Sequence, residues 1–224
     1  LRWMQTRGIA GGGTILALAL AMITVFSFIP AMAWAEDGPE EENPILWTMQ
    51  LDVAATTTAD AVTDLQGNIF MVTFTGNGVV SLSKFYPSSA DQWTKVLTQG
   101  DFISCDASLS VNQAGEVFVC YSTSNSLHTV VSKYNSEGTL LWTRNLSTQF
   151  RGRVFPAAGL YGDVYVTGCN DHTAALPSTD IFLTHFDSTG DELWTRSIAS
   201  NEEDQVVDIA LDLEGNVYIC GTTG

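Results

Sequence analysis

Short apolar runs rich in β-branched and aromatic residues, each ended by a polar turn, dominate the chain after its first 35 residues. The clearest unit has four such runs, at 180–186, 192–198, 206–211 and 217–220. Two of the turns between them have the pattern Asp-x-x-Gly, in which aspartate caps its own turn and glycine accepts a positive φ. Runs of this length and composition predict β-strands, and no helical period is present. We therefore predict an all-β fold built from units of four antiparallel strands.

The four-strand unit is repeated along the chain. Intervals of 46, 49 and 52 residues separate the tryptophans Trp47, Trp93, Trp142 and Trp194. Intervals of 48, 47 and 53 residues separate the starts of a second marker, Gly-x-hydrophobic-aromatic, at Gly67, Gly115, Gly162 and Gly215. Two independent markers with one period near 50 residues indicate the blades of a β-propeller or the turns of a solenoid.

The unit resembles the SBBP repeat, a seven-bladed β-propeller repeat common in secreted microbial proteins. The best copy covers 179–224, where an Asp-hydrophobic strand leads to Asp-x-x-Gly, a Leu-Trp pair, an Asp-bearing loop and Gly-Asn-Val-Tyr-x-x-Gly. Residues 128–168 repeat this pattern, and residues 79–123 carry a weaker copy in which Gln92 precedes Trp93. The resemblance implies a β-propeller with four-stranded antiparallel blades. It implies no particular activity.

The family's blade, laid on this chain, places the strand before the Gly marker innermost and the tryptophan strand outermost. Three complete blades then run over about 58–99, 102–147 and 151–198. A lone outer strand at 45–52 precedes them, and 205–224 form only the inner half of a fourth blade. We expect about 3.5 blades of an incomplete ring, with the missing blades after Gly224. The alternative is a small ring closed by a hybrid blade of 205–224 and 45–52.

The first 35 residues have the three parts of a secretory signal. Arg2 and Arg7 precede an apolar run at 9–29, and Ala33-Trp34-Ala35 provides a cleavage site. An acidic linker at 36–44 follows, and the propeller repeats occupy 45–224. We predict an exported protein that is extracellular, on the cell surface or periplasmic. An uncleaved membrane anchor is the alternative.

The chain is strongly acidic. Its 224 residues contain 25 Asp and Glu against 9 Lys and Arg, which gives a formal net charge of −16. This field repels nucleic acids and anionic membranes, so we expect neither as a partner of the mature protein. The sequence leaves a protein, a glycan and a cation open as ligands.

The cysteines are too sparse for a disulfide scaffold; they are Cys105, Cys120, Cys169 and Cys220. Cys105 and Cys120 flank a predicted hairpin turn but lie diagonally across it, which is a strained placement for a bridge. We expect most or all of the four to be small buried apolar side chains. No Cys-x-x-Cys pattern or Cys/His spacing predicts zinc.

Aspartates recur at two equivalent places of the first and last repeats. Asp60 and Asp208 lie seven residues before the Gly marker, and Asp64 and Asp212 lie three residues before it. On innermost strands such carboxylates could face a central channel and bind a cation. The other two repeats interrupt this ring of charge at both places, with Ser108, Phe155, Asn112 and Gly159. Capping of turns and strand ends explains the aspartates without a ligand, and we prefer this explanation.

The three histidines do not converge. His185 aligns with Lys84 and Lys133, a polar position that we expect to be solvated, whereas His128 and His172 fall in loops or strand starts. No Gly-x-Ser-x-Gly motif supports a Ser/His/Asp triad. We expect each tryptophan to be a packing anchor between blades.

The leading hypothesis is therefore a binding or scaffold module with no catalytic, cofactor-binding or metal-binding residues in this chain. The alternative is part of a propeller enzyme whose active residues lie outside it. A weaker similarity to the tryptophan-docking repeats of quinoprotein dehydrogenases, carried by Thr189-Gly190 and Trp194, makes a quinoprotein the enzyme to consider.

Overall fold

The computed structural model consists of β-strands. It describes residues 2–3, 56–75, 79–87, 92–99, 107–123, 126–146, 153–169, 179–198 and 202–223. None of these segments forms a helix that is long and apolar enough to cross a lipid bilayer. Apart from residues 2–3, the predicted signal at 1–35 lies outside the described residues, as do the linker at 36–44 and the lone strand at 45–52.

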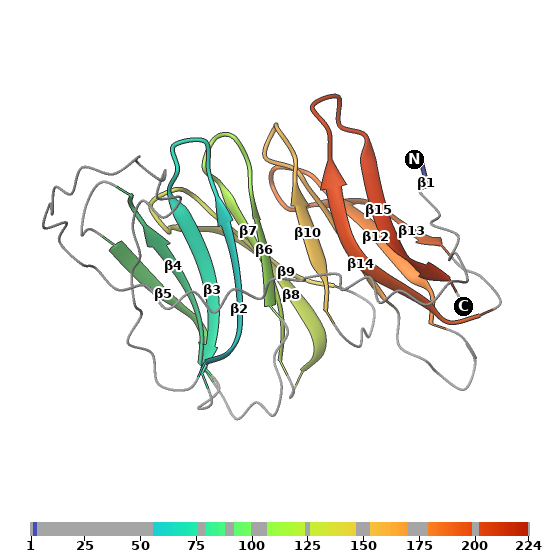
Figure 1. The fold of residues 1–224 in the computed structure, drawn as a ribbon, viewed down its shortest axis with the longest axis horizontal. Coiled ribbons are helices and arrows are strands. Elements are labelled where there is room, and N and C mark those ends of the chain that lie inside the picture. Colours follow the sequence, from blue (N-terminus) through green and yellow to red (C-terminus); the bar gives the residue numbers. More distant parts are fainter. Residues whose placement is uncertain are drawn as a thin grey trace, which may run out of the picture.

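Three four-stranded antiparallel sheets follow one another along the chain, each with its strands in sequence order (Figure 1). The first has β2 (Thr56–Thr63), β3 (Ile69–Thr75), β4 (Val79–Phe85) and β5 (Gln92–Gln99). The second has β6 (Ala107–Val111), β7 (Val117–Thr123), β8 (Ser126–Tyr134) and β9 (Leu140–Asn145). The third has β10 (Phe155–Ala158), β11 (Val164–Cys169), β12 (Ile181–Phe186) and β13 (Glu192–Ile198). Half of a fourth sheet follows, with β14 (Asp204–Leu211) and β15 (Val217–Thr223). The predicted three complete blades and one half-blade are confirmed.

The first strands of the sheets lie next to one another: β2 contacts β6, β6 contacts β10, and β10 contacts β14. The tryptophan strands β5, β9 and β13 form the opposite edge of each sheet. Sheets that meet along their first strands are arranged as the blades of a propeller around a channel. The predicted order, with the first strand inside and the tryptophan strand outside, is therefore confirmed.

A pair of hydroxyl side chains joins the third and fourth strands at the same place in every complete blade. The oxygen–oxygen distances are 2.8, 3.0 and 2.8 Å in the pairs Ser83–Thr94, Ser132–Thr143 and Thr184–Thr195. In each pair the two residues stand directly opposite each other in the strand register. Cross-strand pairs of this kind favour one register over its neighbours.

The apolar core lies between neighbouring blades, and consecutive residues of one strand serve opposite interfaces. Val117 and Val119 of β7 belong to the core shared with the first blade. Phe118 and Cys120, which alternate with them, belong to the core shared with the third blade. All four side chains are buried. This two-sided burial explains why the strands are apolar without a strict alternation of polar and apolar residues.

The tryptophans of the first two blades pack on the turn that joins the third and fourth strands of the next blade, which we call its outer turn. A Cβ atom at Gly190 would lie 2.7 Å from the indole of Trp142, and one at Gly138 would lie 2.9 Å from that of Trp93. Trp142 also donates from Nε1 to the carbonyl of Ser188 at 3.1 Å. The predicted role of tryptophan as an anchor between blades is confirmed at these two positions.

The half-blade has one face that the described residues do not cover. Tyr218 of β15 is 38 % exposed, whereas the equivalent Phe70 and Phe118 of the first two blades are fully buried. The two-residue strand β1 (Arg2–Trp3) pairs with β15 in parallel. Because the strands of a propeller blade are antiparallel, β1 does not take the place of a third blade strand. The described strands form no closed ring, which agrees with the incomplete propeller that we expected.

The cysteines differ in burial, and the three that the structure describes are free thiols. Cys120 is buried as predicted, Cys169 is partly buried, and Cys105 lies outside the described residues. Cys220 is exposed, so the prediction of a buried side chain is wrong there. The reason is that Cys220, like Tyr218, lies on the uncovered face of the half-blade.

The native protein should react with a maleimide at Cys220 long before it reacts at Cys120. Burial raises the pKa of the Cys120 thiol far above its ordinary value, so the folded protein presents no reactive thiolate there. Peptide mapping by mass spectrometry after brief labelling checks this, with labelling in guanidinium as the control in which all cysteines react. Equal labelling of Cys120 and Cys220 in buffer would contradict the described packing of the second and third blades.

Candidate functional site

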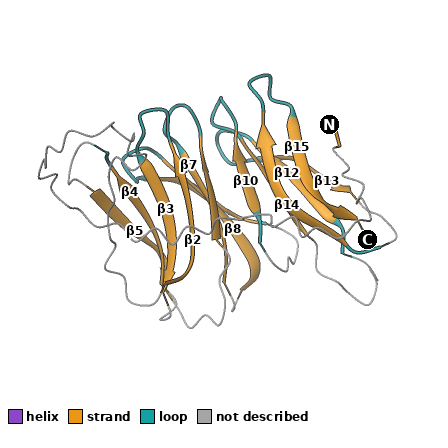
Figure 2. Cartoon of the chain, in the orientation of Figure 1, coloured by secondary structure: helices purple, strands orange, loops and turns teal. Residues whose placement is uncertain are grey.

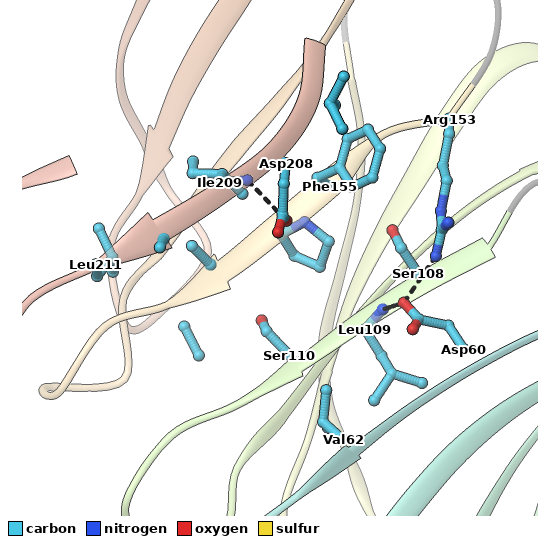
Figure 3. Close-up of a pocket in the computed structure, with 15 residues that line it drawn as sticks. Asp60, Val62, Ser108, Leu109, Ser110, Arg153, Phe155, Asp208, Ile209 and Leu211 are labelled. Atoms are coloured by element: carbon cyan, nitrogen blue, oxygen red, sulfur yellow. Dashed lines mark hydrogen bonds and ion pairs between the residues drawn. The ribbon is translucent and has the colours of Figure 1, made fainter. Parts of the chain in front are cut away.

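The innermost strands line a groove of about 610 Å³ (Figure 3). Its walls come from all four blades: β2, β6, β10 and β14 with the residues just before β10. The lining is largely apolar, with polar groups at the aspartates Asp60 and Asp208, the serines Ser108 and Ser110, and Arg153. Four segments that are far apart in the sequence thus build one concave site, as expected for the channel of a propeller.

Asp60 is held by residues of the two following blades. Its Oδ2 lies 3.1 Å from Nη2 of Arg153 and accepts the backbone amide of Leu109 at 3.2 Å. The guanidinium of Arg153 also lies over the ring of Phe155, 5.2 Å from its centroid. Asp60 does face the channel, but its charge is already paired with Arg153. Asp60 therefore links three blades and is poorly placed to hold a cation.

Asp208 is different, although it occupies the equivalent place in its repeat. It is exposed, and its Oδ1 accepts the backbone amide of Ile209 at 2.8 Å. Ser108 and Phe155 stand at this place in the other two blades and line the same groove, where Ser108 donates to the carbonyl of Val154. The interrupted ring of charge that the sequence indicates is confirmed, with Asp208 as the carboxylate that can meet a ligand.

Ser110 adds an unsatisfied group to the groove. Its Oγ is buried and finds no hydrogen-bond partner among the residues that the structure describes. A buried hydroxyl without a partner is costly. Because this oxygen has almost no accessible surface, a ligand in the groove does not reach it in the described arrangement. In Figure 3 Asp208 and Ser110 come from opposite sides of the groove, on β14 and β6.

Asp64 and Asp212 do not point at the channel as free carboxylates, because each caps its own turn. Oδ1 of Asp64 accepts the amides of Gln66 and Asn68 at 3.0 and 2.9 Å. Asp212 binds its turn in the same way, and its hydrogen bond to the side chain of Asn216 lowers the pKa of its carboxyl group. The capping explanation preferred from the sequence is confirmed for these two aspartates.

The prediction that His185 is solvated is wrong. Lys84, Lys133 and His185 occupy one position on the third strand. The two lysine side chains are buried between blades, and the side chain of His185 is 13 % exposed. Nζ of Lys84 donates to the carbonyl of Ser136, and Nζ of Lys133 donates to that of Gly162. A polar residue within a strand is not exposed when the next blade covers its face, and the sequence alone does not say which face is covered.

His185 belongs to a polar and aromatic cluster of the third blade. Its Nε2 lies 2.9 Å from Oδ2 of Asp163, and its ring stacks on Tyr165 with 4.0 Å between centroids. Burial, and then the charge of Asp163, raise the pKa of the Tyr165 hydroxyl. His128 and His172 do not join this cluster in the described structure: the side chain of the former and the whole of the latter lie outside the described residues.

No group of three or more His, Cys, Asp or Glu side chains comes together as a metal site within the described ranges. The polar groups that line the inner groove are two carboxylates, two hydroxyls and the Arg153 guanidinium, on largely apolar walls, and Asp208 is the exposed carboxylate among them. Such a site can hold a ligand that donates hydrogen bonds. Arg153 and Ser110 were not singled out from the sequence, because no repeat marker identifies either residue.

A comparison with known proteins agrees with this architecture. The family model SBBP, a beta-propeller repeat, matches residues 190–224. The matched segment contains β13, β14 and β15, and so spans the outer strand of the third blade and the half-blade. No curated protein sequence matches the chain. Residues 190–224 thus match the SBBP repeat, and the chain has the four-stranded antiparallel blades of a β-propeller.

Proposed function

We propose that this chain is an exported binding module and that the inner groove holds its ligand. The observation that carries the proposal is the groove itself, because one strand from each of four blades contributes to its wall. A frame of packed sheets holds such strands rigidly, so the groove is preformed, as ligand sites usually are. The signal-like segment at 1–35 supports export.

The chemistry of the groove favours a glycan. The exposed Asp208 can accept a hydrogen bond, and Val62, Leu109 and Ile209 provide apolar walls. A sugar ring has hydroxyl donors at its rim and an apolar face, so it complements both kinds of surface. The net charge of −16 leaves a neutral glycan unaffected while it repels polyanions.

Asp208→Ala should weaken glycan binding at least tenfold, since a hydrogen bond to a charged acceptor contributes about 1.5–3 kcal/mol. The experiment applies the labelled protein to an array of neutral and amino-containing glycans, and titrates the retained glycans calorimetrically. Glu203→Ala is the matched control, because Glu203 is an exposed carboxylate close to β14 that does not line the groove.

Failure to retain any glycan, or equal affinities of wild type and Asp208→Ala, would contradict the glycan proposal. Dye-linked dehydrogenase activity on addition of pyrroloquinoline quinone and calcium would contradict its non-catalytic part and favour the enzyme alternative.

A further inference from the structure

The described turns that join the first to the second strand and the third to the fourth strand of a blade lie at one end of the strands, where they are drawn in teal in the upper part of Figure 2. We call this end the turn face; its six fully described turns are 64–68, 112–116, 135–139, 159–163, 187–191 and 212–216. These turns contain eight Asp and Glu residues and no Lys or Arg. Lys84 and Lys133 reach the turns from β4 and β8, but both are buried. Arg144 reaches the turn at 187–191 from β9 and pairs with Asp191, which leaves the other carboxylates of the face in excess. The surface of the turn face is therefore negative, and it attracts cationic partners.

Apolar side chains project from this acidic face. The second position of three inner turns, the turns between first and second strands, is leucine: Leu65, Leu160 and Leu213 are 73, 37 and 72 % exposed. Tyr161, next to Leu160, is 90 % exposed. A single exposed leucine is ordinary on a protein surface. Apolar tips at one place of three turns, rimmed by carboxylates, are typical of an interaction surface.

The turn face is hollowed between the third and fourth inner turns. This second groove has a volume of about 640 Å³, and its lining includes Leu160, Tyr161 and Leu213 together with Asp212 and Glu214. We call it the turn groove. Three of the four exposed apolar tips line it, so it is the part of the face best able to cover an apolar side chain.

The third inner turn contributes to the shape of this groove. Gly159, which lines it, replaces the aspartate or asparagine that caps the other three inner turns. A Cβ atom at Gly159 would lie 2.0 Å from Oδ1 of Asp163, so the carboxylate of Asp163 occupies the space that a side chain at 159 would need. From there Asp163 bonds to His185. The third turn thus has no capping side chain at residue 159.

The two carboxylates of the fourth inner turn, at 212–216, make different contacts. Asp212 accepts the backbone amide of Asn216 in its own turn, and it also accepts a hydrogen bond from the Tyr218 hydroxyl at 2.9 Å. Glu214 is exposed, and its carboxylate takes part in no hydrogen bond or ion pair within the part of the chain that the structure describes. Glu214 can therefore pair with a cation of a partner without breaking an internal contact.

We propose that the turn groove docks a polypeptide segment in which an apolar side chain stands next to lysine or arginine. The apolar side chain lies among Leu160, Tyr161 and Leu213, and the cation pairs with Glu214. Exposed tyrosine suits this role because it offers a large apolar ring with a polar tip. Charge complementarity selects this partner: the negative face speeds its association and repels acidic segments. This proposal goes beyond the proposed binding of a glycan, because the turn groove is distinct from the inner groove on the innermost strands.

The experiment selects binders from a displayed library of random twelve-residue peptides on the immobilised full chain. The expected result is enrichment of peptides with an apolar residue beside Lys or Arg. Leu213→Ser combined with Glu214→Gln should weaken their binding at least tenfold, and raised salt should weaken it further because the ion pair is exposed. Fluorescence polarisation with one enriched peptide measures both effects.

Leu65→Ser is the matched control, because Leu65 holds the same place in the first turn and does not line the turn groove. It should leave peptide affinity within twofold of wild type. Circular dichroism checks that both variants are folded, which their exposed positions favour. No enrichment, enrichment of other patterns, or equal affinity of Leu213→Ser/Glu214→Gln and wild type would each overturn the proposal.

The two grooves are neighbours, since Ala158 and Leu211 line both. Asp208→Ala therefore separates this proposal from the glycan proposal. It should weaken glycan binding at least tenfold and spare peptide binding. Loss of peptide binding in Asp208→Ala, with retention in Leu213→Ser/Glu214→Gln, would place the peptide in the inner groove and overturn the inference.

Discussion

Gly190→Ala should destabilise the protein by about 3 kcal/mol. This is the sum of two costs, one for holding alanine in a left-handed backbone conformation and one for overpacking a contact. Gly190 has a φ of 84°, and its Cβ would lie 2.7 Å from the indole of Trp142. Trp142 is buried between blades and hydrogen-bonded to Ser188, so it has little room to move. Urea unfolding followed by tryptophan fluorescence gives the change in the free energy of unfolding.

Gly215→Ala is the matched control for this variant. Gly215 has nearly the same φ, 80°, but a Cβ atom there meets nothing within 4 Å. This variant should show only the backbone cost, about 1–2 kcal/mol. Equal losses in the two variants would mean that the indole of Trp142 accommodates the added methyl group without cost, which would contradict its tight packing on the outer turn of the third blade.

Lys133→Met should cost about 2–3 kcal/mol, because it leaves a partly buried charge without its partner. Nζ of Lys133 lies 2.9 Å from Oε1 of Glu116 and 2.9 Å from the carbonyl of Gly162, and the side chain is 3 % exposed. The lysine thus joins the second blade to the third. The loss is smaller than for a fully buried pair, since Glu116 is 25 % exposed and keeps some contact with water.

A double variant separates the loss of charge pairing from the loss of packing. Lys133→Met with Glu116→Gln removes both charges, and it should recover a substantial part of the lost stability. Lys95→Met, at an exposed position of β5, should change the free energy of unfolding by less than about 0.5 kcal/mol. A Lys133→Met variant as stable as wild type would contradict the inter-blade role of the lysine.

The sequence predicts some features of the inner groove and not others. The equivalence of Asp60 and Asp208 follows from the repeat, and both do line the groove. The repeat does not indicate that Asp60 is ion-paired whereas Asp208 is exposed. The partner of Asp60 is Arg153, which comes from another blade and belongs to neither of the two repeat markers. Pairing between blades depends on side chains whose positions in the chain are about two repeats apart, and no local pattern records it.

The burial of polar side chains was the other feature that sequence reasoning missed. Lysine and histidine on a strand indicate exposure in a sheet with one open face. In stacked blades both faces are covered, and the polar head groups are accommodated by carbonyls of the next blade's turns, such as those of Ser136 and Gly162. A basic residue recurs at this position in all three complete blades, and this recurrence is visible in the sequence. That the two lysines bind carbonyl groups of the next blade is known only from the structure.

The sequence by itself determined the four strands of the blade and its capped Asp-x-x-Gly turns. These features depend on contacts between residues close in sequence, so the repeated pattern specifies them. The order from inner strand to outer tryptophan strand came from the resemblance to the family's blade, and the contacts between the first strands of the blades confirm it. Only the tertiary structure decided which carboxylate is paired with Arg153, which side of each strand is covered, and where Leu213 and Tyr161 border a groove. Those outcomes depend on how one blade is placed against the next.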